Sequence, residues 1–170
     1  PPSPPALPGT STHHYLRDRW PGASQWQGNH TLDATAITTC GSSGTWLGGY
    51  GVFGSGVYVE KSLSGLPSHT GLRVEADMIK GDQWYSNKLV LYVDDGEAWS
   101  SVALGSQGVA ICGEVGGHDK EWVLAVDVTV AHLSPNVTIR FTSTSSHVRE
   151  WWGVQDVRLS LVLDHPSPPS

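Results

Sequence analysis

Apolar and polar residues alternate along much of this chain with the period of two that is typical of a half-buried β-strand. Residues 72–78 read LRVEADM and place every second side chain on one apolar face. Residues 88–93 read KLVLYV and are nearly all apolar, as expected for a strand in the middle of a sheet. The Asp94-Asp95-Gly96 sequence that follows favours a tight turn. We therefore predict that these two strands, joined by the polar loop 80–87, pair as a central hairpin on which the other strands pack.

The rest of the chain continues this pattern, and no stretch longer than about two turns has the 3.6-residue period of an amphipathic helix. Residues 137–142 direct Val137, Ile139 and Phe141 to one face and Thr138 and Arg140 to the other. Residues 10–26 are expected to lie across the domain as an edge segment. Many short strands with turn signals between them predict an all-β antiparallel β-sandwich. The other expected strands cover residues 29–40, 56–61, 101–104, 108–112, 122–133 and 154–163.

Composition supports one β-domain. Charged residues make up only 15% of the 170 residues while glycine and tryptophan are abundant, which suits strands and turns better than helices. The length allows one domain with a substantial core, and we place this domain at residues 10–164. The glycine-rich segment 41–56 also carries large apolar residues, so it predicts tight bends with close backbone approach. A phosphate-binding loop is the rival interpretation, but the Gly-Lys-Ser/Thr ending and a following helix are missing from the sequence.

Both ends of the chain are rich in proline, at residues 1–9 and 165–170. Proline lacks an amide proton and holds φ near the polyproline II value, so these ends are expected to be stiff, solvated stems. Placed end to end, the two termini read as a continuous Ser-Pro-Pro repeat. This predicts either a unit of a tandem array or ordinary linkers of a mosaic protein, and the sequence favours neither.

The charge pattern argues against several partners. A formal net charge of −6, with no run of basic residues, makes nucleic acid an unfavourable partner. No apolar run is long enough to span a membrane, and no signal peptide begins the chain, so the sequence resembles a mature segment.

Cysteines and asparagines point to an extracellular protein. The two cysteines, Cys40 and Cys112, form either a disulfide or a pair of buried thiols, and the disulfide is the favoured interpretation. Two of the three asparagines, Asn29 and Asn136, stand in Asn-x-Thr sequons and are predicted to carry N-glycans.

Several motifs resemble those of jelly-roll-like modules in extracellular proteins of ciliates and green algae. They are LGGYGVFGSGVYVEK from Leu47, LPSHTGLRVEADMIKGDQW from Leu66, LYVDD from Leu91 and WWGVQDVRL from Trp151. The chain is also similar to galactose-binding-like and MAM-type sandwiches, and the resemblance implies a jelly-roll-like fold. One departure is that Tyr85 stands where those modules have a second acid after the tryptophan, which removes any role of that acid.

The Ser-Pro-Pro ends resemble the hydroxyproline-rich rods of algal wall and flagellar-surface glycoproteins, such as pherophorins and mastigoneme proteins. That resemblance implies O-linked sugars on the hydroxylated prolines and the serines of both ends. The positions concerned are Pro1, Pro2, Ser3, Pro4, Pro5, Pro166, Ser167, Pro168, Pro169 and Ser170.

The titratable residues do not form a recognisable catalytic pattern. Acids that could act as a pair in glycoside cleavage fall mostly in turns, where a carboxylate caps the backbone and faces water. We expect no enzyme activity, no cofactor and no metal. A calcium ion held by Asp94 and Asp95, or a metal bound by His13, His14 and His118, is a weaker alternative to a solvated surface. The acids that could form such a catalytic pair are Asp77, Asp82, Asp94, Asp95, Glu97, Glu114 and Asp119.

Two functions remain open. The first is a structural glycoprotein module of a surface or wall fibre, whose partners are other copies of itself or neighbouring modules, attached glycans and wall polysaccharide. The alternative is a carbohydrate-binding or adhesion module that uses an aromatic platform. The platform candidates are Trp84, Tyr85, Trp151 and Trp152, although tryptophan in a sandwich is more often part of the core. We favour the structural module.

Overall fold

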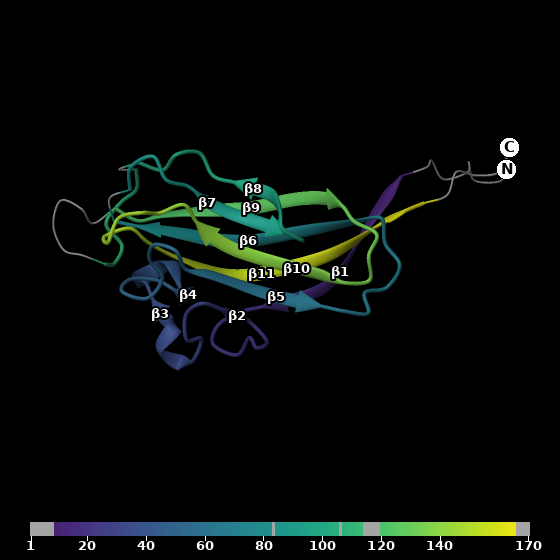
Figure 1. Cartoon of the computed structure of the whole chain (residues 1–170), viewed down its shortest axis with the longest axis horizontal. Helices are drawn as coiled ribbons and strands as arrows, with labels where there is room; N and C mark the ends of the chain where they lie inside the picture. Colours follow the sequence, from purple (N-terminus) through teal and green to yellow (C-terminus); the bar gives the residue numbers. More distant parts are fainter. Residues whose placement is uncertain (1–8, 83, 106, 114–119, 166–170) are drawn as a thin grey trace, which may run out of the picture.

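The structure is a computed structural model that describes residues 9–82, 84–105, 107–113 and 120–165. These residues form two antiparallel sheets that face each other, so the predicted antiparallel β-sandwich is confirmed (Figure 1). The stems 1–8 and 166–170 lie outside the described residues. The strands are β1 (Thr10–Asp18), β2 (Gln27–Gly28), β3 (Ile37–Thr39), β4 (Thr45–Gly48), β5 (Tyr58–Leu63), β6 (Gly71–Gly81), β7 (Leu89–Val93), β8 (Gly96–Ser100), β9 (Trp122–Ala131), β10 (Val137–Ser143) and β11 (Trp151–Asp164).

One sheet has the order β3-β4-β11-β6-β9, with β1 also paired to β11. Strands β1 and β4 share one edge of β11, because β1 pairs with its second half and β4 with Gly153 and Val154. The other sheet has the order β2-β5-β10-β7-β8. The apolar run of β7 therefore lies inside its sheet, as predicted.

The core lies between the two sheets, and the alternation along the strands decides which side chains fill it. Leu72, Val74, Ala76 and Met78 of β6 are all fully buried and belong to the main core cluster. The predicted inward residues of β10, Val137, Ile139 and Phe141, are buried in the same cluster.

The predicted central hairpin is wrong. Strand β6 pairs with β11 and β9, whereas β7 pairs with β10 and β8 in the opposite sheet. The connection after β6 crosses the sandwich, and Trp84 is buried in it with its indole Nε1 donating to the carbonyl of Gly81 at 2.8 Å. The inner faces of β6 and β7 therefore meet across the core and share no hydrogen-bond ladder.

Three further segments differ from the prediction. Residues 101–104 form no strand, and of the segment 108–112 only Val109 makes a bridge, to Glu121. In the expected strand 29–40, residues 34–36 form a single 3-10 turn because the Asp33 side chain accepts the backbone N–H of Thr35. The glycine-rich segment contains β4, which the sequence analysis did not predict.

The two ends of the sandwich have different roles. At one end, called here the terminal end, the first residue of β1 pairs with the last residue of β11. The chain therefore enters and leaves the domain at one place (Figure 1). The opposite end, called here the loop end, is formed by the loops 49–57, 84–88 and 144–150. Within the described residues, no helix is long and apolar enough to cross a membrane.

Candidate functional site

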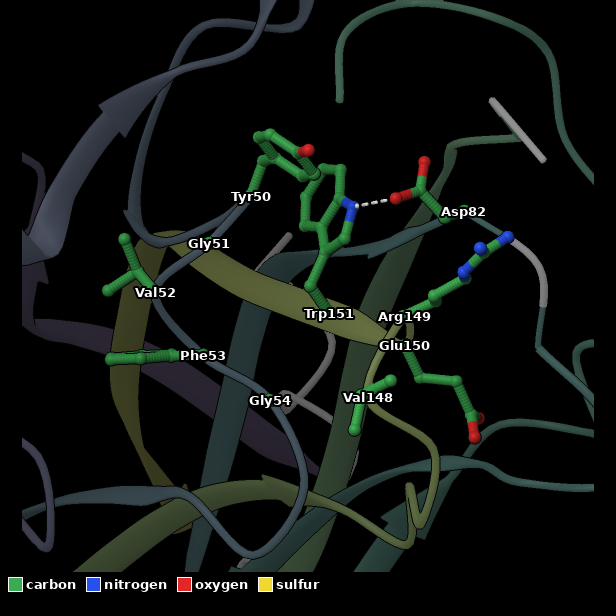
Figure 2. Close-up of a pocket in the computed structure, with 10 residues that line it drawn as sticks. All are labelled: Tyr50, Gly51, Val52, Phe53, Gly54, Asp82, Val148, Arg149, Glu150 and Trp151. Carbon is green, nitrogen blue, oxygen red and sulfur yellow. Dashed lines mark hydrogen bonds between the residues drawn. The ribbon is translucent and has the colours of Figure 1, made fainter. Parts of the chain in front are cut away.

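The loop end contains a cavity of about 480 Å³. One wall is the loop between β4 and β5, and the other is the turn that precedes β11 (Figure 2). Asp82, the residue after the end of β6, closes the cavity, so three segments far apart in sequence meet there. Its lining includes Tyr50, Phe53, Asp82, Val148, Glu150 and Trp151.

Two glycines shape the first wall. Gly48 and Gly49 have φ values of 91° and 102°, in the left-handed region that other residues rarely adopt. A Cβ on Gly48 would lie 2.3 Å from the ring of Phe53. The loop is also bonded to β11, since Gly49 N donates to the Trp152 carbonyl at 2.9 Å and Trp152 N donates to the Phe53 carbonyl at 3.1 Å. The close backbone approach predicted for this segment is confirmed.

An aromatic pair stands at the mouth of the cavity. The indole of Trp151 is almost completely buried, and its Nε1 donates to Oδ2 of Asp82 at 2.9 Å. Tyr50 meets this indole edge-on, with 6.1 Å between the ring centroids, while half of its own surface remains exposed (Figure 2). Trp151 therefore acts as a fixed support, and Tyr50 is the aromatic side chain that a ligand can reach.

Trp151 is held in place from its other side by Gly81. A Cβ on Gly81 would lie 1.7 Å from the indole, so only glycine leaves room for the ring. Asp82, the next residue, has a φ of 62°, which turns its carboxylate toward the indole nitrogen. The site is thus positioned by the end of a rigid central strand.

Buried charges lie beside the cavity. Lys80 is fully buried, and its Nζ donates to the carbonyl of Asp82 at 2.9 Å and more weakly to that of Gly105 at 3.4 Å. Burial lowers the pKa of Lys80 to about 8, although the carboxylates of Glu121, Asp82 and Glu150 oppose this fall. The ammonium group thereby ties the backbone at Asp82 and at Gly105 to the end of β6.

Glu150 also has a structural partner. Both of its carboxylate oxygens accept from Nδ2 of Asn87, at 3.1 and 3.0 Å. In Figure 2 its side chain turns away from Tyr50. Its backbone carbonyl lies beside Gly54 across the cavity.

The predicted disulfide between Cys40 and Cys112 is confirmed. It belongs to a second apolar cluster with Trp46, Ile79 and Trp151, outside the main core. The disulfide therefore fastens residues 111–113 over the face of the sheet that carries Trp151. The alternative of two buried thiols is wrong.

The structure separates the four predicted platform residues. Trp84 and Trp152 are 1% and 0% exposed and pack in the main core, so neither can offer a face to a ligand. Tyr85 is 57% exposed and lies edge-on to His147, but it does not line the cavity. Only Trp151 lines it, and the exposed aromatic beside it is Tyr50, which the sequence analysis did not select.

The weaker metal alternatives use Asp94 with Asp95 for calcium, and His13, His14 and His118 for another metal ion. Both carboxylate oxygens of Asp94 are engaged, one by the backbone N–H of Thr138 at 2.8 Å and one by His132 at 2.7 Å. His13 and His14 are exposed on β1, and His118 lies outside the described residues. Within the described residues, the trio of potential ligands Cys40, Cys112 and Glu121 is close enough to share an ion, but its sulfurs form the disulfide.

No family model and no curated protein matches the sequence of this chain. Solved structures do resemble it. A family 35 carbohydrate-binding module from an environmental isolate aligns with 91% of this chain and 100% of its own, at 11% identity and a TM-score of 0.51. The tandem family 22 carbohydrate-binding modules of Paenibacillus barcinonensis Xyn10C align with 95% of this chain and 49% of theirs, at 11% identity and a TM-score of 0.54.

A third similar structure is dimeric latent PorU from Porphyromonas gingivalis, which aligns with 95% of this chain and 14% of its own, at 10% identity and a TM-score of 0.51. At such identities the likeness concerns the fold. The jelly-roll-like fold that the sequence motifs implied is thereby confirmed. The resemblance to ciliate and algal glycoproteins stays a prediction.

Proposed function

We propose that this chain is an extracellular module that binds carbohydrate, without cleaving it, in the loop-end cavity. The observation that carries the proposal is the half-exposed Tyr50 ring at the mouth of a cavity of about 480 Å³, backed by the buried Trp151. Sugar sites combine an aromatic face with a few fixed polar groups. The exposed Arg149 guanidinium, which also lines the cavity, is such a group here, whereas the buried Asp82 and Glu150 shape the wall.

The fold supports the same proposal. Two of the similar structures are carbohydrate-binding modules, and one of them aligns over its whole length. Because fold alone does not imply function, the cavity and its aromatic residue remain the stronger support.

The state of the two carboxylates in the cavity argues for binding and against hydrolysis. Asp82 accepts from Trp151, and Glu150 accepts from Asn87. A glycosidase needs one carboxyl group free to donate a proton and a second free to attack or to activate water. Carboxylates that position an indole and an amide are not suited to those roles.

The disulfide supports the extracellular location, since such bonds persist in oxidising compartments. The fibre module that we first favoured rests on the proline-rich ends, which lie outside the described residues. It stays a prediction with less support than carbohydrate binding.

The direct test is a glycan array probed with the whole chain, followed by calorimetric titration of the best ligand. Tyr50→Ala is expected to weaken binding at least about tenfold, the effect of losing roughly 1.4 kcal/mol of contact. Tyr85→Ala is the matched control, because this tyrosine is similarly exposed at the same end but does not line the cavity.

Unchanged thermal unfolding of both variants would show that neither change acts through the fold. Silence on an array of neutral and acidic glycans, or equal loss of binding in both variants, would overturn the proposal.

A further inference from the structure

The two sequons, Asn29-His30-Thr31 and Asn136-Val137-Thr138, have the same sequence signal but different surroundings. Both asparagines are exposed. The Asn29 amide is engaged at both ends, since Nδ2 donates to the Gly56 carbonyl at 2.7 Å and Oδ1 accepts the backbone N–H of Tyr58 at 2.9 Å. The Asn29 side chain therefore holds its own segment against the start of β5.

The neighbours of Asn29 make this contact tight. A Cβ on Gly28 would lie 2.1 Å from the Tyr58 carbonyl oxygen, so the two backbones touch directly. On the other side, His30 lies edge-on to Phe53 with 5.6 Å between ring centroids. A sugar on Nδ2 of Asn29 would have to grow from an atom already in contact with Gly56, and displacing it would disturb the loop that forms one wall of the cavity.

Asn136 has none of these constraints. It lies in the turn between β9 and β10 at the terminal end, where its backbone N–H donates to Oγ of Ser134 at 3.1 Å. Among the described residues, no hydrogen bond engages its side-chain amide. The hydroxyl of Thr138, the third sequon residue, bonds to Oγ of Ser62 at 2.8 Å across the pair of strands β10 and β5.

We propose that Asn136 is the N-glycosylation site of this domain and that Asn29 is a structural residue that remains unmodified in the folded protein. In the modification, Nδ2 of Asn136 bonds to the anomeric carbon of a lipid-linked oligosaccharyl diphosphate. The bond from that carbon to the diphosphate breaks, the diphosphate lipid leaves, and the amide nitrogen releases one proton. The glycan then projects from the end opposite the cavity and leaves the cavity open.

The test uses the whole chain secreted from a eukaryotic host, with glycopeptide mapping of the folded fraction. We expect a glycan on Asn136 alone. Asn136→Gln should remove all N-linked mass, whereas Thr31→Ala should leave that mass unchanged. Thr31→Ala is the suitable control because it destroys the first sequon while the Asn29 amide and its two bonds stay intact.

The structural role of Asn29 is measured without glycosylation, on protein made in the bacterial periplasm. Asn29→Ala should lower the melting temperature by about 3 to 6 °C, because two hydrogen bonds are lost, while Asn136→Ala should not change it. A glycan on Asn29 of the folded protein, an empty Asn136, or equal melting temperatures of the two alanine variants would overturn the proposal.

Discussion

The imidazole Nε2 of His69 lies 2.8 Å from Nδ1 of His132, and the two rings are nearly parallel. His69 Nδ1 donates to the Pro67 carbonyl at 2.6 Å, and His132 Nε2 bonds to Oδ2 of Asp94 at 2.7 Å. His69 lies just before β6 and His132 just after β9 of the six-stranded sheet, whereas Asp94 lies in the turn after β7 of the other sheet. A chain of three hydrogen bonds thus connects the two sheets at the terminal end.

The acceptors at the two ends of this series of hydrogen bonds determine which ring nitrogens donate. The Pro67 carbonyl and the ionised Asp94 carboxylate only accept, so His69 Nδ1 and His132 Nε2 must both carry protons.

Removing either ring should break the connection between the sheets. We expect His69→Ala and His132→Ala each to lower the free energy of unfolding by about 1 to 3 kcal/mol, because the remaining ring, buried His69 or half-buried His132, loses a hydrogen bond. A double-mutant cycle by urea unfolding should give a coupling of about 1 kcal/mol. The exposed His14 on β1 is the control, and additive effects of the two substitutions would contradict a direct bond.

The disulfide should be a major source of stability. It closes a loop across a sequence separation of 72 residues, and the loop-entropy relation gives about 4 kcal/mol for such a loop. Alanine at both Cys40 and Cys112 avoids adding a polar group to the buried cluster. Urea unfolding should show a loss of this order, and hydrogen exchange should show faster exchange in residues 111–113. Coincident unfolding curves of the natural chain and the double-alanine variant would contradict a stabilising role for the disulfide.

Lys80 should make stability depend on pH in the alkaline range. Burial lowers the pKa of Lys80 to about 8, while the unfolded chain retains a value near 10.5. Between these values the unfolded state binds more protons, so the contribution of Lys80 to stability rises as the pH increases from 8 to 10.5. The full difference in pKa corresponds to at most about 3 kcal/mol.

The test compares the natural chain with the Lys80→Met variant. The variant lacks the Lys80 amine and keeps every other titratable group. The free energy of unfolding of the natural chain minus that of the variant should grow by about 1 to 3 kcal/mol across that window. A constant difference would show that the Lys80 amine titrates alike in both states.

Gly81→Ala should displace Trp151, since the added methyl group would fall 1.7 Å from the indole. We expect the free energy of unfolding to fall by about 1 to 3 kcal/mol, with a changed near-ultraviolet circular dichroism spectrum. Gly54→Ala is the control, because its nearest new neighbour would be the Glu150 carbonyl at 3.8 Å. Equal effects of the two substitutions would count against a specific role for the Gly81 contact.

Alternation along a strand reports which face is buried, and this is why the inward residues of β6 and β10 were predicted correctly. It does not report the pairing partner. The loop after β6 had the length and polarity of a hairpin connection, and its crossing of the sandwich depends on the burial of Trp84, a tertiary contact.

The same limit applies to the site. Residue type identified tryptophans as platform candidates, but packing buried Trp84 and Trp152 and left Tyr50 exposed. One signal was available, since Tyr50 stands between Gly49 and Gly51 in a segment where glycine prevents a regular strand. An aromatic residue that interrupts a run of glycines is poorly placed for a core and well placed at a loop surface.

The antiparallel pairing of β1 with β11 has a mechanical consequence. A pull applied between Thr10 and Asp164 would break the hydrogen bonds of their ladder one pair at a time, because β1 begins where the antiparallel β11 ends. Such a pair yields at low force, so this domain is poorly suited to bear tension in line. If both ends of the domain were attached to a support, the domain would project from that support with Tyr50 at its distal end.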